Sequence, residues 1–154
     1  SDHTLYDVLE TCRKKSDGIN LTFFEGTTAA AFLAFSQIKA DIVLLETGMG
    51  GRLDATNILP KPALTIITPI SMDHMEFLGD TLSAIAHEKA CIMKREVPCV
   101  IAPQAMPALA SIEDYSEAVH APLYLFDRDW DVMQEKAHFI YRSKHREIKS
   151  ALPA

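Results

Sequence analysis

The sequence contains few of the features that mark disulfide-rich, membrane or nucleic-acid-binding proteins. Its only cysteines, Cys12, Cys91 and Cys99, form no CxxC pair and no zinc-like spacing, so we expect reduced thiols in an intracellular, cytoplasmic protein. No apolar run approaches the ~20 residues of a membrane-spanning helix. Fifteen Lys and Arg stand against 21 Asp and Glu, and such an acidic chain without a basic stripe favours neither nucleic acid nor a membrane as partner.

The standard phosphate-binding loop is also missing. No G-x-x-x-x-G-K-[ST] motif occurs, and no lysine directly follows any of the six glycines. The chain begins at Ser1 and runs directly into helix-like sequence. We therefore expect an internal piece of a longer protein.

The sequence does contain a regular alternation of strand-like and helix-like segments. Its 48% apolar and 23% charged residues are typical of a globular domain. Hydrophobic spacing predicts helices before Asp17-Gly18 and at residues 27–38, 81–94 and 107–119, with a short extended piece at residues 21–24. The Ala-rich helix at residues 27–38 is predicted to be buried. Compact apolar runs predict strands at residues 41–46, 63–70, 99–102 and 123–126. This order predicts an α/β fold, a mostly parallel sheet flanked by helices on both sides.

The C-terminal part has a different pattern. Short alternating runs at residues 130–133 and 138–141 surround a polar turn, which predicts a small β-hairpin at the edge of the domain. Residues 142–149 carry four basic side chains against one acid and no aromatic. We interpret this run as a solvated surface rather than a binding patch.

Glu46 is the first candidate for chemistry. It closes the predicted strand at residues 41–46 and precedes a turn in which three of the six glycines fall within four positions. Ligands of such sheets bind outside the carboxyl ends of the strands, and glycines let the backbone approach a ligand closely. A solvated glutamate before an ordinary turn is the alternative.

Asp73 and His74 follow the next predicted strand at the equivalent end. A carboxylate beside an imidazole could bind a metal or move protons. A structural histidine with satisfied hydrogen bonds is the more common case. The functional interpretation gains weight because Glu46 and His74 end two strands predicted to be neighbours.

Lys89 lies on the apolar stripe of a predicted helix. The stripe consists of Leu82, Ile85, Ala86, Lys89 and Met93. A lysine there must extend its amine to solvent, find an anion or lose its charge. An uncharged, desolvated amine could react with carbon dioxide to give a carbamate, which would offer oxygen to a divalent cation.

Three segments together resemble one enzyme family. LTFFEGTTAAAFLAF, DIVLLETGMGGRLDATN and ITPISMDHMEFLGDTLSAIAHEKACI are similar to the ATPase domain of folylpolyglutamate synthase/dihydrofolate synthase, in the Mur ligase superfamily. The resemblance implies that Glu46 and His74 are magnesium ligands and that Lys89 is carbamylated and contributes to a metal site. It also implies a pteridine pocket lined by residues matching Thr22, Phe24, Asp54 and Ala55.

The resemblance further implies an ATP-dependent ligase. In the intact enzyme ATP would phosphorylate a carboxylate of dihydropteroate or a folate, and L-glutamate would attack the acyl phosphate. Mg²⁺ would be the cofactor and the whole protein would be a monomer. Residues 1–126 would be a partial ATPase domain lacking its phosphate loop, residues 127–154 its edge hairpin and tail, and the C-terminal ligase domain would be absent. We expect this chain alone to be inactive.

Two other functions remain open from the sequence. A stand-alone metal-dependent hydrolase could use Glu46, Asp73 and His74, with His87 or Glu88 as a further ligand. A non-catalytic interaction module could have kept the fold and lost the activity. HEKAC, where relatives more often carry REKAG, places His87 and Cys91 beside Lys89 without removing a ligand.

Overall fold

A computed structural model describes residues 2–135 and 137–151 and divides the chain into two compact units. The first unit contains the chain up to Gly48 together with Leu53–Ile58. The second unit contains Met49–Arg52 and the chain from Leu59 onward. The short turn Met49–Arg52 therefore packs with the second unit although both its sequence neighbours belong to the first.

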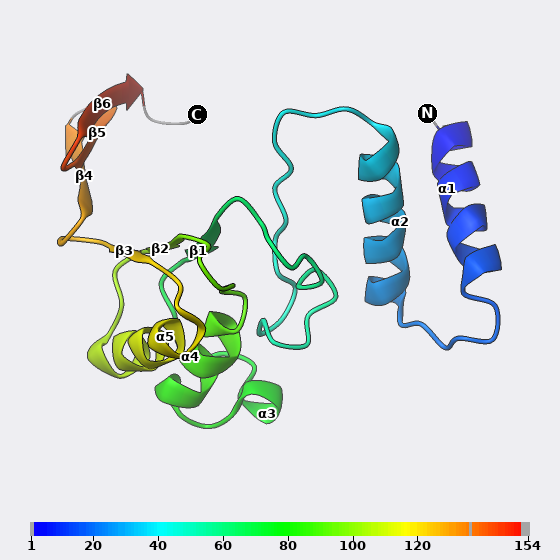
Figure 1. Cartoon of the computed structure of the whole chain (residues 1–154), viewed down its shortest axis with the longest axis horizontal. Helices are drawn as coiled ribbons and strands as arrows, with labels where there is room; N and C mark the ends of the chain where they lie inside the picture. The colour runs from blue at the N-terminus through cyan, green and yellow to red at the C-terminus, as the bar shows by residue number, and fades with distance from the viewer. Residues whose placement is uncertain (1, 136, 152–154) are drawn as a thin grey trace. The chain divides into compact units, whose positions relative to one another are not determined.

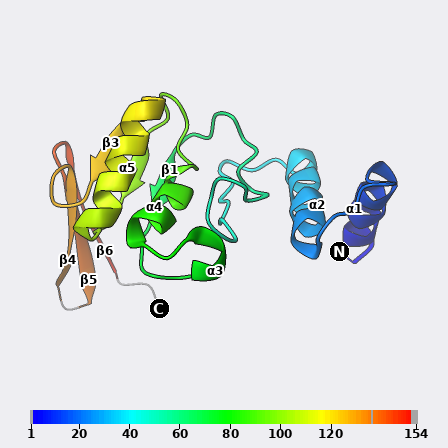
Figure 2. The ribbon, with the colours of Figure 1, turned by 90° about the horizontal axis from the view of Figure 1, so that it is seen from below.

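Two helices, α1 (Asp2–Lys15) and α2 (Phe23–Gln37), lie side by side in the first unit (Figures 1 and 2). The predicted first helix is confirmed. It has Asp2 in its first turn and three basic residues in its last, which suits the helix dipole. The chain turns after it at Gly18, whose φ is +80°.

The start of α2 corrects the extended piece predicted at residues 21–24. Thr22 Oγ1 accepts a hydrogen bond from the Glu25 N–H at 3.2 Å, and the Glu25 carboxylate accepts one from the Thr22 N–H at 2.8 Å. This capping box starts the helix at Phe23. The helix predicted at residues 27–38 is confirmed, but its predicted burial is wrong, because of the α2 residues only Ala30 is buried.

The strand predicted at residues 41–46 does not form. The segment is irregular, and Ile42 and Leu44 are 78% and 87% exposed. A strand needs a neighbour to pair its backbone N–H and C=O groups, and none of the strands in residues 2–135 and 137–151 pairs with this segment. Its apolar side chains could be buried, but no other part of the described chain covers Ile42 and Leu44.

A parallel sheet organises the second unit and confirms the predicted α/β fold. Strands β1 (Thr65–Ile67), β2 (Cys99–Ile101) and β3 (Leu123–Leu125) lie in that order, all parallel. Helix α4 (Leu82–Ala90) connects β1 to β2, and α5 (Met106–Val119) connects β2 to β3. These strands and helices correspond to the predicted segments, although α4 ends earlier than residue 94.

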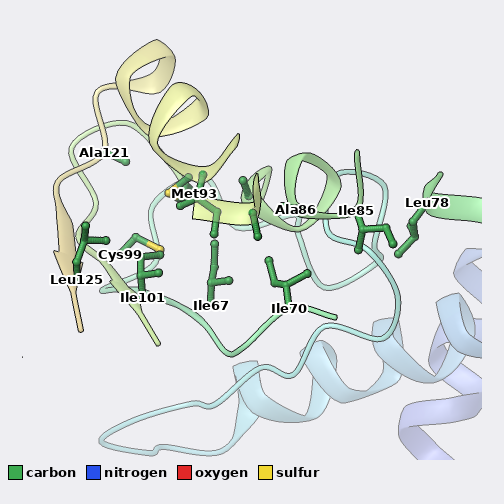
Figure 3. Close-up of a cluster of buried hydrophobic side chains, with 13 residues drawn as sticks. Ile67, Ile70, Leu78, Ile85, Ala86, Met93, Cys99, Ile101, Ala121 and Leu125 are labelled. Carbon is green, nitrogen blue, oxygen red and sulfur yellow. The ribbon is translucent and has the colours of Figure 1, made fainter. Parts of the chain in front are cut away.

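The core lies between this sheet and its helices (Figure 3). Ile67, Ile101 and Leu125 point into it from the three strands, and Ile85 and Ile112 enter from α4 and α5 without measurable exposure. On the opposite face Ile66 and Tyr124 are 56% and 50% exposed. In the described part of this unit the predicted helical cover is therefore present on one face of the sheet only.

A second, antiparallel sheet follows. Strands β4 (Trp130–Glu135), β5 (His138–Ser143) and β6 (Arg146–Ala151) lie in sequence order. The predicted hairpin is confirmed as β4 and β5, but β6 was not predicted. All β6 residues are exposed, so the basic run is a solvated surface as expected, and its lack of an apolar face explains why the hydrophobic pattern missed this strand.

Candidate functional site

The glycine-rich turn Met49–Arg52 packs closely against two helices of the second unit. A Cβ on Gly50, whose φ is +66°, would lie 2.9 Å from Leu78 Cδ2 in α3 (Met75–Leu78). A Cβ on Gly51 would lie 2.6 Å from the Glu88 carbonyl oxygen in α4. These approaches leave no room for side chains. The turn thus touches the helix that follows His74 and the helix that carries Lys89.

Arg52 fastens the same turn to α4. Its N–H donates to the Glu88 carbonyl at 3.1 Å, and its Nε donates to Glu88 Oε1 at 2.8 Å. The hydrogen bond from Arg52 to the Glu88 carboxylate raises the pKa of the guanidinium. Main chain and side chain therefore both hold this point of the helix.

Lys89 follows Glu88 on the predicted apolar stripe. Its stripe neighbours Ile85, Ala86 and Met93 are at most 1% exposed, whereas Lys89 itself is half-buried. Among residues 2–135 and 137–151, no hydrogen bond or ion pair involves its Nζ. Within α4 the buried stripe is confirmed at Ile85 and Ala86, whereas Met93 lies beyond the end of the helix at Ala90. The Lys89 amine is not fully buried, and it has no anionic partner among the described residues.

His74 stands at the N-terminus of α3 in the left-handed conformation, with φ 49° and ψ 39°. Asp73 holds it, because Asp73 Oδ1 accepts from the His74 N–H at 2.8 Å and Oδ2 lies 3.5 Å from His74 Nε2. The imidazole is 46% exposed. A non-glycine residue in this conformation is uncommon and is often found at functional sites. A metal-binding histidine commonly has a carboxylate on its other ring nitrogen, which here would leave Nδ1 for a ligand.

Glu46 and Phe24 line one hollow in the first unit. This hollow of about 150 Å³ is bounded by three aromatic rings, by Glu46 and by Thr56; the rings are Phe24, Phe32 and Phe35. Glu46 is exposed, and among the described residues its carboxylate has no hydrogen-bond or ion-pair partner. An acid without a partner beside an open aromatic hollow is suited to a cation or to hydrogen-bond donors of a flat ligand.

Asp54 holds the loop beneath this hollow. Its Oδ2 accepts from the Gly48 N–H at 2.9 Å, while Oδ1 accepts from the Thr56 N–H at 2.9 Å and from Thr56 Oγ1 at 2.6 Å. Gly48 in turn lies against the Phe24 ring, where a Cβ would be 2.5 Å from Cζ. The predicted ligand carboxylate thus has a structural role, and the adjacent Ala55 is half-buried.

The two units divide the predicted site residues between them. Thr22, Phe24, Glu46, Asp54 and Ala55 belong to the first unit, where Thr22 caps α2. His74 and Lys89 belong to the second unit. His74 directly precedes α3 and Lys89 lies in α4, and the turn Met49–Arg52 packs against both helices.

The additional ligands considered for a hydrolase have other partners. Glu88 is paired with Arg52, and the His87 ring packs edge-on against Tyr115 with centroids 5.5 Å apart. In the described part of the chain no group of three or more His, Cys, Asp or Glu could hold a metal ion. The two further ligands considered for a hydrolase, His87 and Glu88, are thus engaged in other contacts.

Comparison with known families shows to which family this chain belongs. The model of the Mur ligase middle domain matches residues 3–151, nearly the whole chain. The chain belongs to the Mur ligase middle-domain family. The resemblance noted in the three sequence segments is thereby confirmed at the family level.

Curated relatives of this Mur ligase middle domain are folate enzymes. A dihydrofolate synthase/folylpolyglutamate synthase of Haemophilus influenzae is 42% identical over 125 residues, 81% of this chain and 28% of that protein. A Bacillus subtilis enzyme of the same name is 48% identical over 102 residues, 66% of this chain and 24% of that protein. The chain spans about a quarter of the length of these relatives.

Solved structures show the same similarity. The bifunctional folylpolyglutamate synthase/dihydrofolate synthase of Yersinia pestis CO92 has a TM-score of 0.86 at 34% identity and covers 99% of this chain and 36% of its own. A bifunctional synthase with Mn, AMPPNP and L-glutamate bound has a TM-score of 0.84 at 34% identity, covering 96% of this chain and 35% of its own. These likenesses extend beyond the fold, since the identities exceed 30%.

Sequence reasoning missed Arg52 in this Mur ligase domain. The sequence did contain a signal for Arg52, because this charged residue directly follows a double glycine. The structure shows that the turn packs closely. No spacing rule connects it to Glu88, which lies 36 residues further along the chain.

None of the helices in residues 2–135 and 137–151 is long and apolar enough to cross a membrane.

Proposed function

We propose that this Mur ligase middle domain is the ATP-handling part of a ligase that couples a pteroate or folate carboxylate to L-glutamate. The observation that carries the proposal is the 42–48% identity to dihydrofolate synthase/folylpolyglutamate synthases over 125 and 102 residues of this chain. A related structure with AMPPCP and folate, 31% identical with a TM-score of 0.80, supports nucleotide and folate as ligands. ATP, L-glutamate and the folate are then the small-molecule partners of a cytoplasmic, monomeric protein.

Glu46, His74 and Lys89 would hold the divalent cation. Glu46 and a carbamate on Lys89 would offer the oxygen atoms that Mg²⁺ prefers, and His74 would add a less usual nitrogen ligand. Because Mg²⁺ keeps few protein ligands, water and phosphate would complete its shell. Asp73 orients the His74 ring, and the Glu46 carboxylate and Lys89 amine have no partner among the described residues. When bound, Mg²⁺ neutralises charge on the transferring phosphoryl oxygens.

Carbamylation would make Lys89 an anionic ligand. The uncharged Nζ forms a bond to the carbon of carbon dioxide and releases one proton, which leaves a carbamate oxygen as donor. The half-buried position on an apolar stripe, with no partner for the amine among the described residues, supports this step. Extra electron density beyond Nζ would identify the carbamate, and a bare ammonium that points to solvent would argue against it.

Phe24, Asp54, Ala55 and Thr22 would shape the pteridine pocket. Phe24 supplies a flat ring at the edge of the aromatic hollow, suited to stacking on a heterocycle. Asp54 would accept hydrogen bonds from the amino edge of the ligand while it keeps the loop in place.

Substitution of Lys89 in the intact protein tests this function against a non-catalytic module. We expect Lys89→Met to lower glutamate-dependent ADP release by at least ~100-fold and to preserve or raise thermal stability, since methionine suits the apolar stripe. Unchanged ADP release together with raised stability would instead favour the interaction module. The 154-residue chain by itself should release no ADP with ATP, Mg²⁺, dihydropteroate and glutamate.

A further inference from the structure

The C-terminal end of α4 is completed by a segment far away in sequence. The last four carbonyl groups of a helix have no partner within it, and in α4 (Leu82–Ala90) these include Glu88 and Lys89. The Arg52 N–H donates to the Glu88 carbonyl, and the Ile92 N–H donates to that of Lys89 at 3.3 Å. The glycine-rich turn therefore serves as a cap for the turn of helix that carries Lys89.

The closeness of this contact depends on Gly51. Besides the Glu88 oxygen, a Cβ there would lie 2.9 Å from Ile92 Cγ2 and 3.1 Å from the Lys89 carbonyl oxygen. Only a residue without a side chain lets the Arg52 backbone reach the helix end. The turn thus lies close to the carbonyl groups of both Glu88 and Lys89.

The Arg52 side chain adds a second attachment. Its Nε bonds to Glu88 Oε1 at 2.8 Å, and the side chains are 54% and 21% exposed. A cation near a helix C-terminus is also favourable with the helix dipole. The Glu88 carboxylate is thereby engaged by Arg52, and the neighbouring Lys89 amine stays without an anionic partner among the described residues.

We propose that Arg52 and Glu88 are positioning residues, which hold the last turn of α4 so that the Lys89 side chain leaves the helix in one fixed direction. This role rests on the proposed function, in which Lys89 contributes to the metal site. Neither residue needs to touch substrate. The pair acts by restricting Lys89, and its loss should weaken metal binding more than it lowers overall stability.

The experiment compares Arg52→Gln with the wild-type intact protein. We expect Mn²⁺ binding, followed by electron paramagnetic resonance without substrate, to weaken about 10- to 100-fold, as for other residues that orient metal ligands. The amides of Cys91 and Ile92 should exchange hydrogen faster. The magnesium concentration for half-maximal ADP release should rise by a similar factor. Metal binding and magnesium requirement within twofold of wild type would overturn the proposal.

Arg142→Gln is the matched control. Arg142 makes an equivalent bond from Nε to Glu147 Oε2 at 2.9 Å, in the antiparallel sheet of the same unit. It should leave metal binding and the α4 amides within twofold of wild type. An equal loss of metal binding in this control would show a general effect of removing an arginine and would overturn the proposal.

The charge-reversed double variant Arg52→Glu/Glu88→Arg tests the pair itself. If metal binding recovers relative to Arg52→Gln, the two residues act as a pair in positioning Lys89. If it does not recover, the loss of metal binding is due to removal of the Arg52 guanidinium alone, and the proposed role of the pair is overturned. Failure of the wild-type protein to release ADP with glutamate would refute the proposed ligase function. Mn²⁺ binding and amide exchange, which need no substrate, would still decide the positioning role.

Discussion

At the scale of single residues, Gly51 shows how one missing side chain determines a contact. Gly51→Ala would place a Cβ 2.6 Å from a backbone oxygen and 2.9 Å from Ile92 Cγ2. Backbone cannot move aside cheaply, so we expect a loss of about 1–3 kcal/mol in the free energy of unfolding, typical of overpacking. Urea denaturation measures the difference.

Gly26→Ala is the control for this prediction. Gly26 lies inside α2, and a Cβ there would meet nothing within 4 Å. Alanine is a better helix former by about 1 kcal/mol, so this variant should be as stable as wild type or more so. Equal stability changes in the two variants would show that packing at Gly51 is not the cause.

Cys99 is expected to make stability depend on alkaline pH. Its thiol is fully buried in the core against the parallel sheet, and desolvation raises its pKa to about 11, above the usual range of a thiol. The folded state therefore keeps a proton that the unfolded chain loses. The contribution of Cys99 to the free energy of unfolding is complete below pH 9 and is lost as pH rises through 11. The expected loss is about 2–3 kcal/mol.

Urea unfolding at pH 8 and pH 11 measures this effect. Because tyrosines and lysines also titrate there, the relevant quantity is the difference in pH dependence between wild type and Cys99→Ala. A variant that loses stability with pH as steeply as wild type would contradict the assignment. Cys12, half-buried in α1, should react with alkylating reagents at pH 8 well before Cys99 does.

At the scale of elements, the capping box of α2 has a measurable role. Thr22→Ala removes the oxygen that accepts from the Glu25 N–H. We expect the variant to lose about 1 kcal/mol of stability, seen as a lower thermal midpoint and reduced helical circular dichroism. Thr22→Ser keeps the hydroxyl and should stay near wild type; a loss as large as that in Thr22→Ala would mean that the methyl group, not the cap, stabilises this region.

The elements also show where local pattern succeeds. Residues 99–102 and 123–126 form strands as predicted because each finds a parallel neighbour, whereas residues 41–46, with equal apolar character, find none among the described residues. Pairing is a property of two segments, so composition of one cannot decide it. The strand β6 is the opposite case, formed by pairing with β5 despite full exposure.

At the scale of the whole molecule, the buried core is unevenly distributed. Of the buried apolar residues, only Val8 and Ala30 belong to the first unit as described, and all others lie in the second. Local opening is easier where few apolar contacts oppose it. We expect backbone amides of α1 and α2 to exchange hydrogen at least ~10-fold faster than those of α4 and α5, as measured by mass spectrometry. Equal protection in both pairs of helices would contradict this.

By itself, the sequence determined the α/β class, the parallel strands of the second unit and the membership of the Mur ligase middle-domain family. These features follow from hydrophobic periodicity and from motifs that are local in the chain. Only the tertiary structure decided that residues 41–46 pair with no strand in the described part of the chain, that Asp54 holds its own loop and that Arg52 fastens the turn to Glu88. The physical reason is that each of these depends on atoms brought together from distant positions, whose distances no local pattern encodes.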